Sequence, residues 1–237
     1  PQEELANFKT IGDIGYMAPQ TSNHDVQRPN VYTRNTIDQL KVAITFFLTL
    51  RSIPFIYYGD EIGMKFNENA PEKEGSRELF ANGFVNERAG SRTPMQWTNG
   101  INAGFSTCAP ENIFLPVDTD GGALTVETQE KDPDSMLNYV RKILALRQES
   151  RAMSNLGDWV SNPDQPYPMV YKRYSGDELY VIALNPSGKK VSAQFPTLGR
   201  TGAEVFSTVG KASYKFNKGT DKVELGPVSA VIYKLTK

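Results

Sequence analysis

The stretch that decides the fold is Ile53-Pro54-Phe55-Ile56-Tyr57-Tyr58, a run of apolar and aromatic residues closed by Gly59. Because polar residues do not alternate with apolar ones, the run predicts a strand buried on both faces, as in a parallel sheet. Upstream, residues 36–51 predict an amphipathic helix that opens with a capping box, and the apolar segment 14–18 predicts another strand. Strand, helix and strand in this order predict a βα unit with parallel pairing.

Downstream of this unit, residues 59–131 are rich in Gly, Pro and Asn and keep no lasting period. A stretch of this length without regular structure is more often a functional loop than a plain connector. Regular structure returns at Asp132, an N-cap followed by a proline at the first helical position, and the apolar spacing predicts a helix to about Ser150.

From about Leu156 the pattern changes to short strands separated by Asn-Pro, Ser-Gly and Lys-Gly turns. The expected strands are Met169–Tyr174, Glu178–Leu184, Val191–Phe195, Ala203–Ser207 and Val228–Leu235. Together they predict a small antiparallel sheet or sandwich, with a domain boundary near residues 152–157.

The composition excludes several classes of function. The chain has 237 residues with 26 basic and 27 acidic side chains, and no charge block suggests binding to nucleic acid or to a membrane surface. No apolar run is long enough to predict a transmembrane helix. One histidine and one cysteine argue against a zinc or iron–sulfur site and exclude an internal disulfide framework. The cellular compartment stays open.

The polar groups that could carry chemistry concentrate in Thr21-Ser22-Asn23-His24-Asp25-Val26-Gln27-Arg28-Pro29, directly after the first predicted strand. Polar residues at the carboxyl end of a strand are where α/β proteins carry their functional groups. The alternative is an ordinary Asx-type turn that carries a surface histidine.

Four motifs point further when they are taken together. They are Asn23-His24-Asp25, Ile56-Tyr57-Tyr58-Gly59-Asp60-Glu61-Ile62-Gly63-Met64, Arg92-Thr93-Pro94-Met95-Gln96-Trp97 and Asn102-Ala103-Gly104-Phe105-Ser106. In this order and spacing they resemble the C-terminal part of the α-amylase superfamily of glycoside hydrolases. The third motif points to the branch of α-glucosidases, oligo-1,6-glucosidases and trehalose synthases. The resemblance covers nearly the whole chain and is strongest from residue 16 to residue 150.

This resemblance implies an α/β region followed by an all-β region. Residues 1–154 would be the C-terminal part of a catalytic (β/α)8 TIM barrel, with strands at 14–18 and 53–58, helices at 36–51 and 133–150, and a long loop after the last strand. Residues 155–237 would be a small C-terminal β-sandwich domain.

Retaining glycosidases use one carboxylate as the nucleophile and a second as the general acid/base. In the family these residues lie on the fourth and fifth barrel strands, which would fall upstream of Pro1. The resemblance therefore implies that this chain alone is inactive and needs the N-terminal remainder of the barrel as its partner. The implied substrate is an α-linked glucose oligosaccharide or disaccharide, and neither a metal nor a cofactor is implied.

The resemblance makes Asp25 the third catalytic carboxylate and His24 its substrate-binding neighbour, so that the two side chains bind adjacent hydroxyls of one sugar. Arg92 would reach a hydroxyl at the non-reducing end of the sugar, and its alternative is a structural ion pair with a loop carboxylate. Arg28 would bind near the leaving group, although this chain reads Val-Gln-Arg where family members often read Gln-Pro-Arg. Asn23 completes the predicted substrate-binding set.

Two further pairs and one rival function stay open. Asp60 and Glu61 are expected to accept hydrogen bonds from backbone donors of their turn. Trp97 and Phe105 would either stack on sugar faces or bury the long loop. The rival function is a non-catalytic member of the superfamily that acts as a binding or scaffold protein. Such members commonly lose the His-Asp pair, so its presence favours an enzyme. Linkage preference, and hydrolysis as against transfer, are undetermined.

Overall fold

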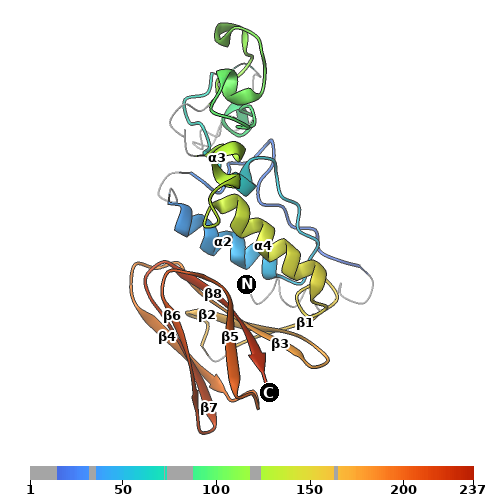
Figure 1. Ribbon diagram of the computed structural model, residues 1–237, viewed down its shortest axis with the longest axis vertical. Helices are drawn as coiled ribbons and strands as arrows, with labels where there is room; N and C mark the ends of the chain where they lie inside the picture. Colours follow the sequence, from blue (N-terminus) through green and yellow to red (C-terminus); the bar gives the residue numbers. More distant parts are fainter. Residues whose placement is uncertain (1–14, 32–35, 72, 74–87, 118–123, 163–164) are drawn as a thin grey trace, which may run out of the picture. The chain divides into compact units, whose positions relative to one another are not determined.

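The computed structural model of the protein describes residues 15–31, 36–71, 73, 88–117, 124–162 and 165–237 (Figure 1). The chain divides into two compact units. The first consists of residues 1–19, 41–54 and 142–237, and the second consists of residues 20–40 and 55–141. Each unit is therefore built from segments that are far apart in the sequence.

The two segments predicted as parallel strands pair only locally. The Ile53 amide donates to the Met17 carbonyl at 2.9 Å, and the Thr21 amide donates to the Phe55 carbonyl at 3.0 Å. These bonds flank one isolated parallel bridge, between Gln20 and Phe55. In this register the next donor would be residue 19, a proline without an N–H, so the ladder is interrupted. The parallel pairing is present, but neither described segment forms a continuous strand.

The predicted capping box is present at the start of helix α2 (Ile37–Thr49). The Gln39 amide donates to Thr36 Oγ1 at 3.2 Å, and the Thr36 amide donates to Gln39 Oε1 at 3.3 Å. These reciprocal bonds satisfy donors that a helix start leaves unpaired, which explains why the sequence pattern located this helix well.

Helix α4 (Met136–Glu149) begins three residues later than the sequence predicted. Asp132 is not its N-cap, because the Asp132 carboxylate accepts from the Asp134 amide at 2.9 Å in a separate Asx turn. Ser135 has that role instead: its hydroxyl oxygen accepts from the Asn138 amide at 3.2 Å.

Between the two helices, the described part of the loop contains short elements. They are the 3-10 helices η1 (Asp60–Ile62), η3 (Arg88–Ser91), η4 (Ile101–Gly104) and η5 (Pro110–Asn112), and the short helix α3 (Val126–Glu130). The prediction of a long irregular segment therefore holds for the described residues, apart from α3.

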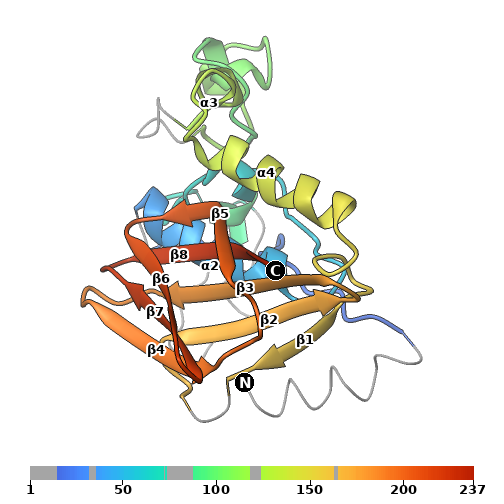
Figure 2. The ribbon, with the colours of Figure 1, turned by 60° about the horizontal axis from the view of Figure 1, so that its bottom comes forward.

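The C-terminal region forms two antiparallel sheets (Figure 2). One sheet has the order β1-β2-β3-β8-β5, with β1 (Asp158–Ser161), β2 (Met169–Ser175), β3 (Glu178–Asn185), β8 (Ser229–Thr236) and β5 (Gly202–Val209). The other has the order β4-β7-β6, with β4 (Val191–Pro196), β7 (Thr220–Leu225) and β6 (Ala212–Asn217). All five predicted strands are present, whereas β1, β6 and β7 were missed.

One apolar core joins the two sheets. Val181 of β3 and Val231 of β8 pack in the same cluster as Ala193 of β4 and Val223 of β7. Burial of these side chains from both sheets supplies the hydrophobic stabilisation of this region.

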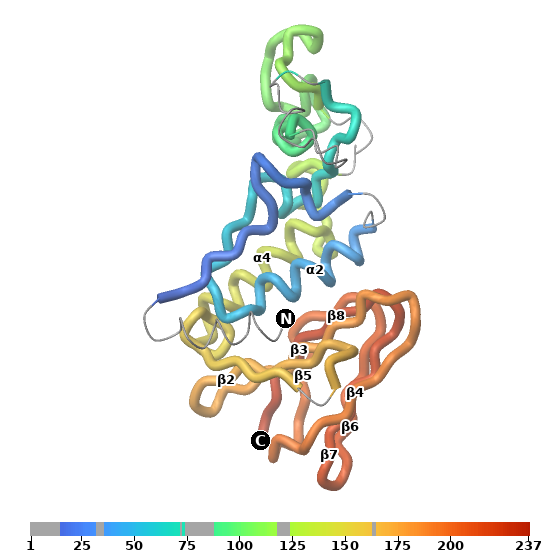
Figure 3. Tube along the Cα trace, turned by 180° about the vertical axis from the view of Figure 1, so that it is seen from behind, coloured from blue at the N-terminus to red at the C-terminus, as the bar shows by residue number. Residues whose placement is uncertain are grey.

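Two buried arginines cap the carboxyl end of α2, whose backbone runs beside that of α4 in Figure 3. Arg147 of α4 donates to the carbonyls of Leu48 at 2.6 Å and Leu50 at 2.9 Å. Arg173 of β2 donates to the Thr49 carbonyl at 2.5 Å and also to the Ser154 carbonyl. Burial lowers the pKa of Arg173 to about 9, so its guanidinium stays charged at neutral pH. A positive charge suits this place, because unpaired carbonyls give a helix end partial negative charge.

Replacing Arg173 by methionine is expected to lower the free energy of unfolding by about 2–4 kcal/mol, because several buried carbonyls lose their donor. Urea denaturation measures the change. The matched control is Arg200→Met, which removes an exposed bond to the Asp177 carbonyl and should cost less than about 1 kcal/mol. Equal losses in the two variants would contradict the capping role of Arg173.

Candidate functional site

The site begins with a tight turn at residues 23–26, here called the His-Asp turn. The Asn23 side-chain oxygen accepts from the backbone amides of Asp25 at 2.7 Å and Val26 at 3.1 Å. This is the Asx turn that asparagine favours, and it leaves the side chains of His24 and Asp25 exposed at the tip. The Asn23 side chain therefore shapes the turn.

The structure brings the side chains of His24 and Asp25 together. His24 Nε2 lies 3.2 Å from Asp25 Oδ2, and the two side chains are 64% and 47% exposed. An exposed imidazole and carboxylate at this separation can each contact a polar group of the same ligand. The Asx turn with a surface histidine, which was the alternative to a functional site, is therefore present, and it exposes both side chains to solvent.

Two arginines hold the other oxygen of the Asp25 carboxylate. Arg88 NH1 lies 2.8 Å from Asp25 Oδ1, and Arg92 NH2 lies 3.3 Å from it. The hydrogen bond from Arg88, aided by the charges of the neighbouring cations, holds the pKa of Asp25 below its usual value. Asp25 is therefore ionised over a wide pH range.

Both arginines belong to residues 88–92, here called the arginine turn, which consists of η3 and the residue after it. Arg92 was predicted as a site residue and Arg88 was not. The four-residue spacing of these two arginines was the signal that could have found Arg88, since the spacing puts two cations on one short turn.

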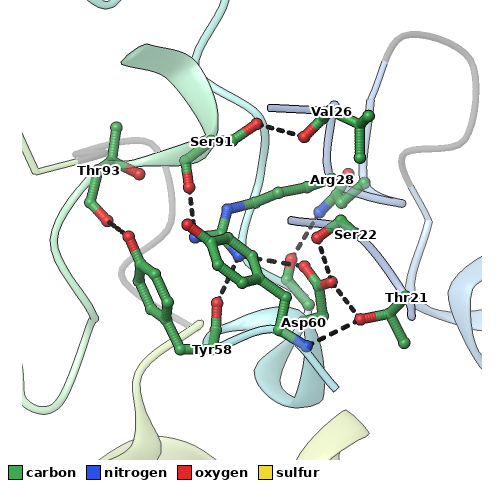
Figure 4. Close-up of polar contacts among 11 residues, drawn as sticks. Thr21, Ser22, Val26, Arg28, Tyr58, Asp60, Ser91 and Thr93 are labelled. Carbon is green, nitrogen blue, oxygen red and sulfur yellow. Dashed lines mark hydrogen bonds and ion pairs between the residues drawn. The ribbon is translucent and has the colours of Figure 1, made fainter. Parts of the chain in front are cut away.

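A buried ion pair joins Arg28, which follows the His-Asp turn by two residues, to Asp60 (Figure 4). Asp60 Oδ1 lies 3.1 Å from Arg28 NH1, while Asp60 Oδ2 accepts from the hydroxyls of Thr21 at 2.6 Å and Ser22 at 2.5 Å. Burial raises the pKa of Asp60, against the charge of Arg28 and these hydrogen bonds. Asp60 and Glu61 were expected to accept from backbone donors. The expectation is wrong for Asp60, whose partners are side chains from a distant segment. It holds for Glu61, since hydrogen bonds from the Glu61 and Gly59 backbone act to lower the pKa of that carboxyl.

Arg28 is completely buried and holds three segments together. Its NH1 also donates to the Tyr58 carbonyl at 2.5 Å, and its NH2 donates to the Ser91 carbonyl at 2.9 Å. The rings of Tyr57 and Tyr58 lie 5.0 and 4.8 Å from its guanidinium carbon. Arg28 therefore does not join the exposed group formed by His24, Asp25 and Arg92, but contacts the arginine turn from inside.

A pocket of about 450 Å³ lies beside the arginine turn. Arg92 and Glu61 supply its charged groups, and burial raises the pKa of Glu61. The rest of the lining is mostly apolar and comes from Tyr58, Pro94, Met95, Trp97, Phe105, Ile113, Phe114 and Leu115. Trp97 and Phe105 are each about half exposed, so neither side chain is fully buried within the loop. Arg92 thus links the Asp25 carboxylate to this pocket.

Within the described residues, no group of three or more His, Cys, Asp or Glu side chains is arranged to hold a metal ion. The same residues contain no helix long and apolar enough to cross a membrane.

The comparisons with known proteins agree with one another on one family. The family model described as the alpha amylase catalytic domain matches residues 5–155. A probable oligo-1,6-glucosidase 2 from Bacillus subtilis is 27% identical over 91% of this chain and 41% of its own length. A trehalose synthase from Thermus thermophilus is 28% identical over 82% of this chain and 19% of its own length. The chain thus spans about two-fifths, or less, of these curated relatives.

Solved structures agree with the sequence matches. A trehalulose synthase variant in complex with Tris superposes with a TM-score of 0.79 at 25% identity, over 99% of this chain and 46% of that one. An isomaltulose synthase variant from Erwinia rhapontici NX5, in complex with its natural substrate sucrose, gives a TM-score of 0.77 at the same identity and coverage.

Proposed function

Because this chain belongs to the α-amylase family, we propose that it is the C-terminal part of a retaining α-glucoside hydrolase or transglycosylase. Its substrate would be an α-linked gluco-oligosaccharide or disaccharide, and the intact protein would be the enzyme. The curated relatives named above are an oligo-1,6-glucosidase and a trehalose synthase, and the solved structures include one with sucrose bound. These names support a glucoside substrate.

The proposal assigns residues 1–154 to the C-terminal part of a (β/α)8 barrel and residues 155–237 to a β-sandwich domain. The parallel bridge between Gln20 and Phe55 supports the barrel assignment, because consecutive barrel strands run parallel. The core shared by the two antiparallel sheets supports the sandwich assignment.

One observation carries the function: the His24 and Asp25 side chains meet at an exposed turn that directly follows a parallel-paired segment. We assign Asp25 as the carboxylate that binds a sugar hydroxyl more tightly in the oxocarbenium-like transition state than in the ground state. His24 would donate to the adjacent hydroxyl without carrying a fixed charge.

The other candidates have supporting roles. Arg92 would bind a sugar hydroxyl from the pocket side, since it lies both beside Asp25 and in the pocket wall. Asn23 holds the His-Asp turn in shape. For Arg28 we propose a positioning role in place of the leaving-group contact that the resemblance implied, because its side chain is 0% exposed.

The test is turnover by the intact protein on maltose, isomaltose, trehalose and sucrose, with β-linked cellobiose as the matched control. We expect turnover of at least one α-glucoside and none of cellobiose. Proton NMR of the first product should show the α-anomer, as retention requires. Binding of these sugars without turnover would contradict the enzyme and support the scaffold reading.

A further inference from the structure

The arginine turn holds the His-Asp turn through several donors. Ser91 Oγ donates to the Val26 carbonyl at 2.6 Å, and Arg92 Nε donates to the His24 carbonyl at 2.9 Å. Arg88 and Arg92 then bind the Asp25 carboxylate itself. In all these contacts the donor lies on residues 88–92, so the arginine turn fixes both the backbone and the acidic side chain of the His-Asp turn.

The two arginines differ in what else they hold. Arg92 also binds a backbone carbonyl and lines the pocket, and its contact with Asp25 Oδ1 is the longer one at 3.3 Å. The Arg88 contact with the same oxygen is 2.8 Å, the length of a strong charge-assisted hydrogen bond. The Arg88 and Arg92 side chains are 24% and 22% exposed, so both are less exposed than the Asp25 side chain at 47%, and the length of the contact is what distinguishes them.

The two carboxylate oxygens are therefore in different surroundings. Oδ1 is held by arginines, whereas Oδ2 faces the imidazole of His24 at 3.2 Å. A carboxylate fixed at one oxygen keeps a constant direction at the other, and catalysis depends steeply on such alignment.

Resting on the function proposed above, we propose that Arg88 is the positioning residue for Asp25. Its guanidinium fixes Oδ1 and keeps the carboxylate ionised, which leaves Oδ2 and the His24 imidazole directed toward two adjacent sugar hydroxyls. In this proposal Arg88 acts through its contact with Asp25.

Charge alone does not reproduce this role. A guanidinium is planar and presents its donors in a fixed fork, whereas a lysine ammonium is a point charge on a flexible stem. Lysine at position 88 should keep Asp25 ionised but orient it less well. Glutamine should lose both effects.

The experiment compares Arg88→Lys and Arg88→Gln in the intact protein with the control Arg141→Gln. Arg141 is a matched control because it also forms an ion pair at 3.1 Å, with Glu130, away from Asp25. For Arg88→Gln we expect kcat to fall about tenfold or more with little change in KM, because alignment is lost while the sugar contacts remain. Arg88→Lys should fall between Arg88→Gln and the unaltered protein, and Arg141→Gln should match the unaltered protein.

A second readout is independent of turnover. Carbon-13 NMR titration of aspartate carboxylates, with the Asp25 signal assigned by its loss in Asp25→Asn, follows the pKa of Asp25. We expect this pKa to rise in Arg88→Gln, to rise less in Arg88→Lys and to stay unchanged in Arg141→Gln, since among the described residues the titratable or charged groups facing Asp25 are His24, Arg88 and Arg92.

The outcomes separate the two proposals. If the intact protein turns over α-glucosides but Arg88→Gln behaves like Arg141→Gln in kcat and in the pKa of Asp25, the positioning role is wrong and the function stands. If no α-glucoside is turned over while the pKa of Asp25 still depends on Arg88, the contact is real but the function proposal is wrong. A fall in kcat that Arg88→Lys rescues in part, together with the rise in pKa, supports both.

Discussion

Replacing Asp25 by asparagine in the intact protein is expected to lower kcat for its α-glucoside by about 10³-fold, with KM changed far less. Asparagine has nearly the same size as aspartate, so the exposed turn keeps its shape. What disappears is the negative charge that Arg88 and Arg92 hold in place and that would stabilise the transition state. Steady-state kinetics on the best of the disaccharides tested would measure the change.

Asp177→Asn is the matched control for this variant. Asp177 is also exposed, it pairs with Lys237 at 3.1 Å, and a hydrogen bond from that lysine lowers its pKa. Asp177 therefore resembles Asp25 in its exposure and in its pairing with a cation, but it does not belong to the His-Asp turn. Its replacement by asparagine should leave kcat unchanged. If Asp25→Asn retained near-normal turnover, the assignment of Asp25 would fail.

The second large effect concerns stability. Replacing Asp60 by leucine should lower the free energy of unfolding by about 3–5 kcal/mol, because it leaves the Arg28 guanidinium charged, buried and without its carboxylate. The hydroxyls of Thr21 and Ser22 lose their acceptor in the same variant. Urea denaturation followed by intrinsic fluorescence would measure the loss.

Two further variants make this prediction specific. Glu130→Gln removes a surface ion pair with Arg141 and should cost less than about 1 kcal/mol. The double variant Arg28→Met with Asp60→Leu should recover part of the loss, because removing both charges leaves no unpaired ion. A single Asp60 variant as stable as Glu130→Gln would show that the buried pair contributes little to the fold.

Local patterns predicted the fold well where local contacts determine it. Helix α2 was located because its capping box and its apolar face lie within one short segment. Strand β6 was missed because its residues 215–217 are exposed, and strand β7 was missed because one of its buried positions holds the polar Asp221, so neither sequence shows the alternation that predicts a strand. The segment 14–18, of which residue 14 lies outside the described residues, and the segment 53–58 were predicted as full strands, since the sequence alone did not reveal that Pro19 interrupts their register.

The site could be predicted only in part, for a related reason. Asn23, His24 and Asp25 are consecutive, so one motif found all three. The contact of Arg88 with Asp25 joins residues 63 positions apart, and that of Arg28 with Asp60 joins residues 32 positions apart. Such contacts depend on the tertiary fold, which brings distant segments together. A sequence motif that contains one of the two residues therefore does not identify the other.

The two arginines at the end of α2 limit how this protein could be divided or recombined. Because Arg173 belongs to a strand, a chain cut after residue 154 would lose the donor to Thr49 as well as the sheets. A chimera that received its C-terminal sheets from a relative would need an arginine in β2 at the position equivalent to Arg173. The C-terminal sheets thus contribute directly to the stability of α2 through Arg173. We expect an exchange of these sheets between relatives to succeed only when the incoming sheets carry the equivalent arginine.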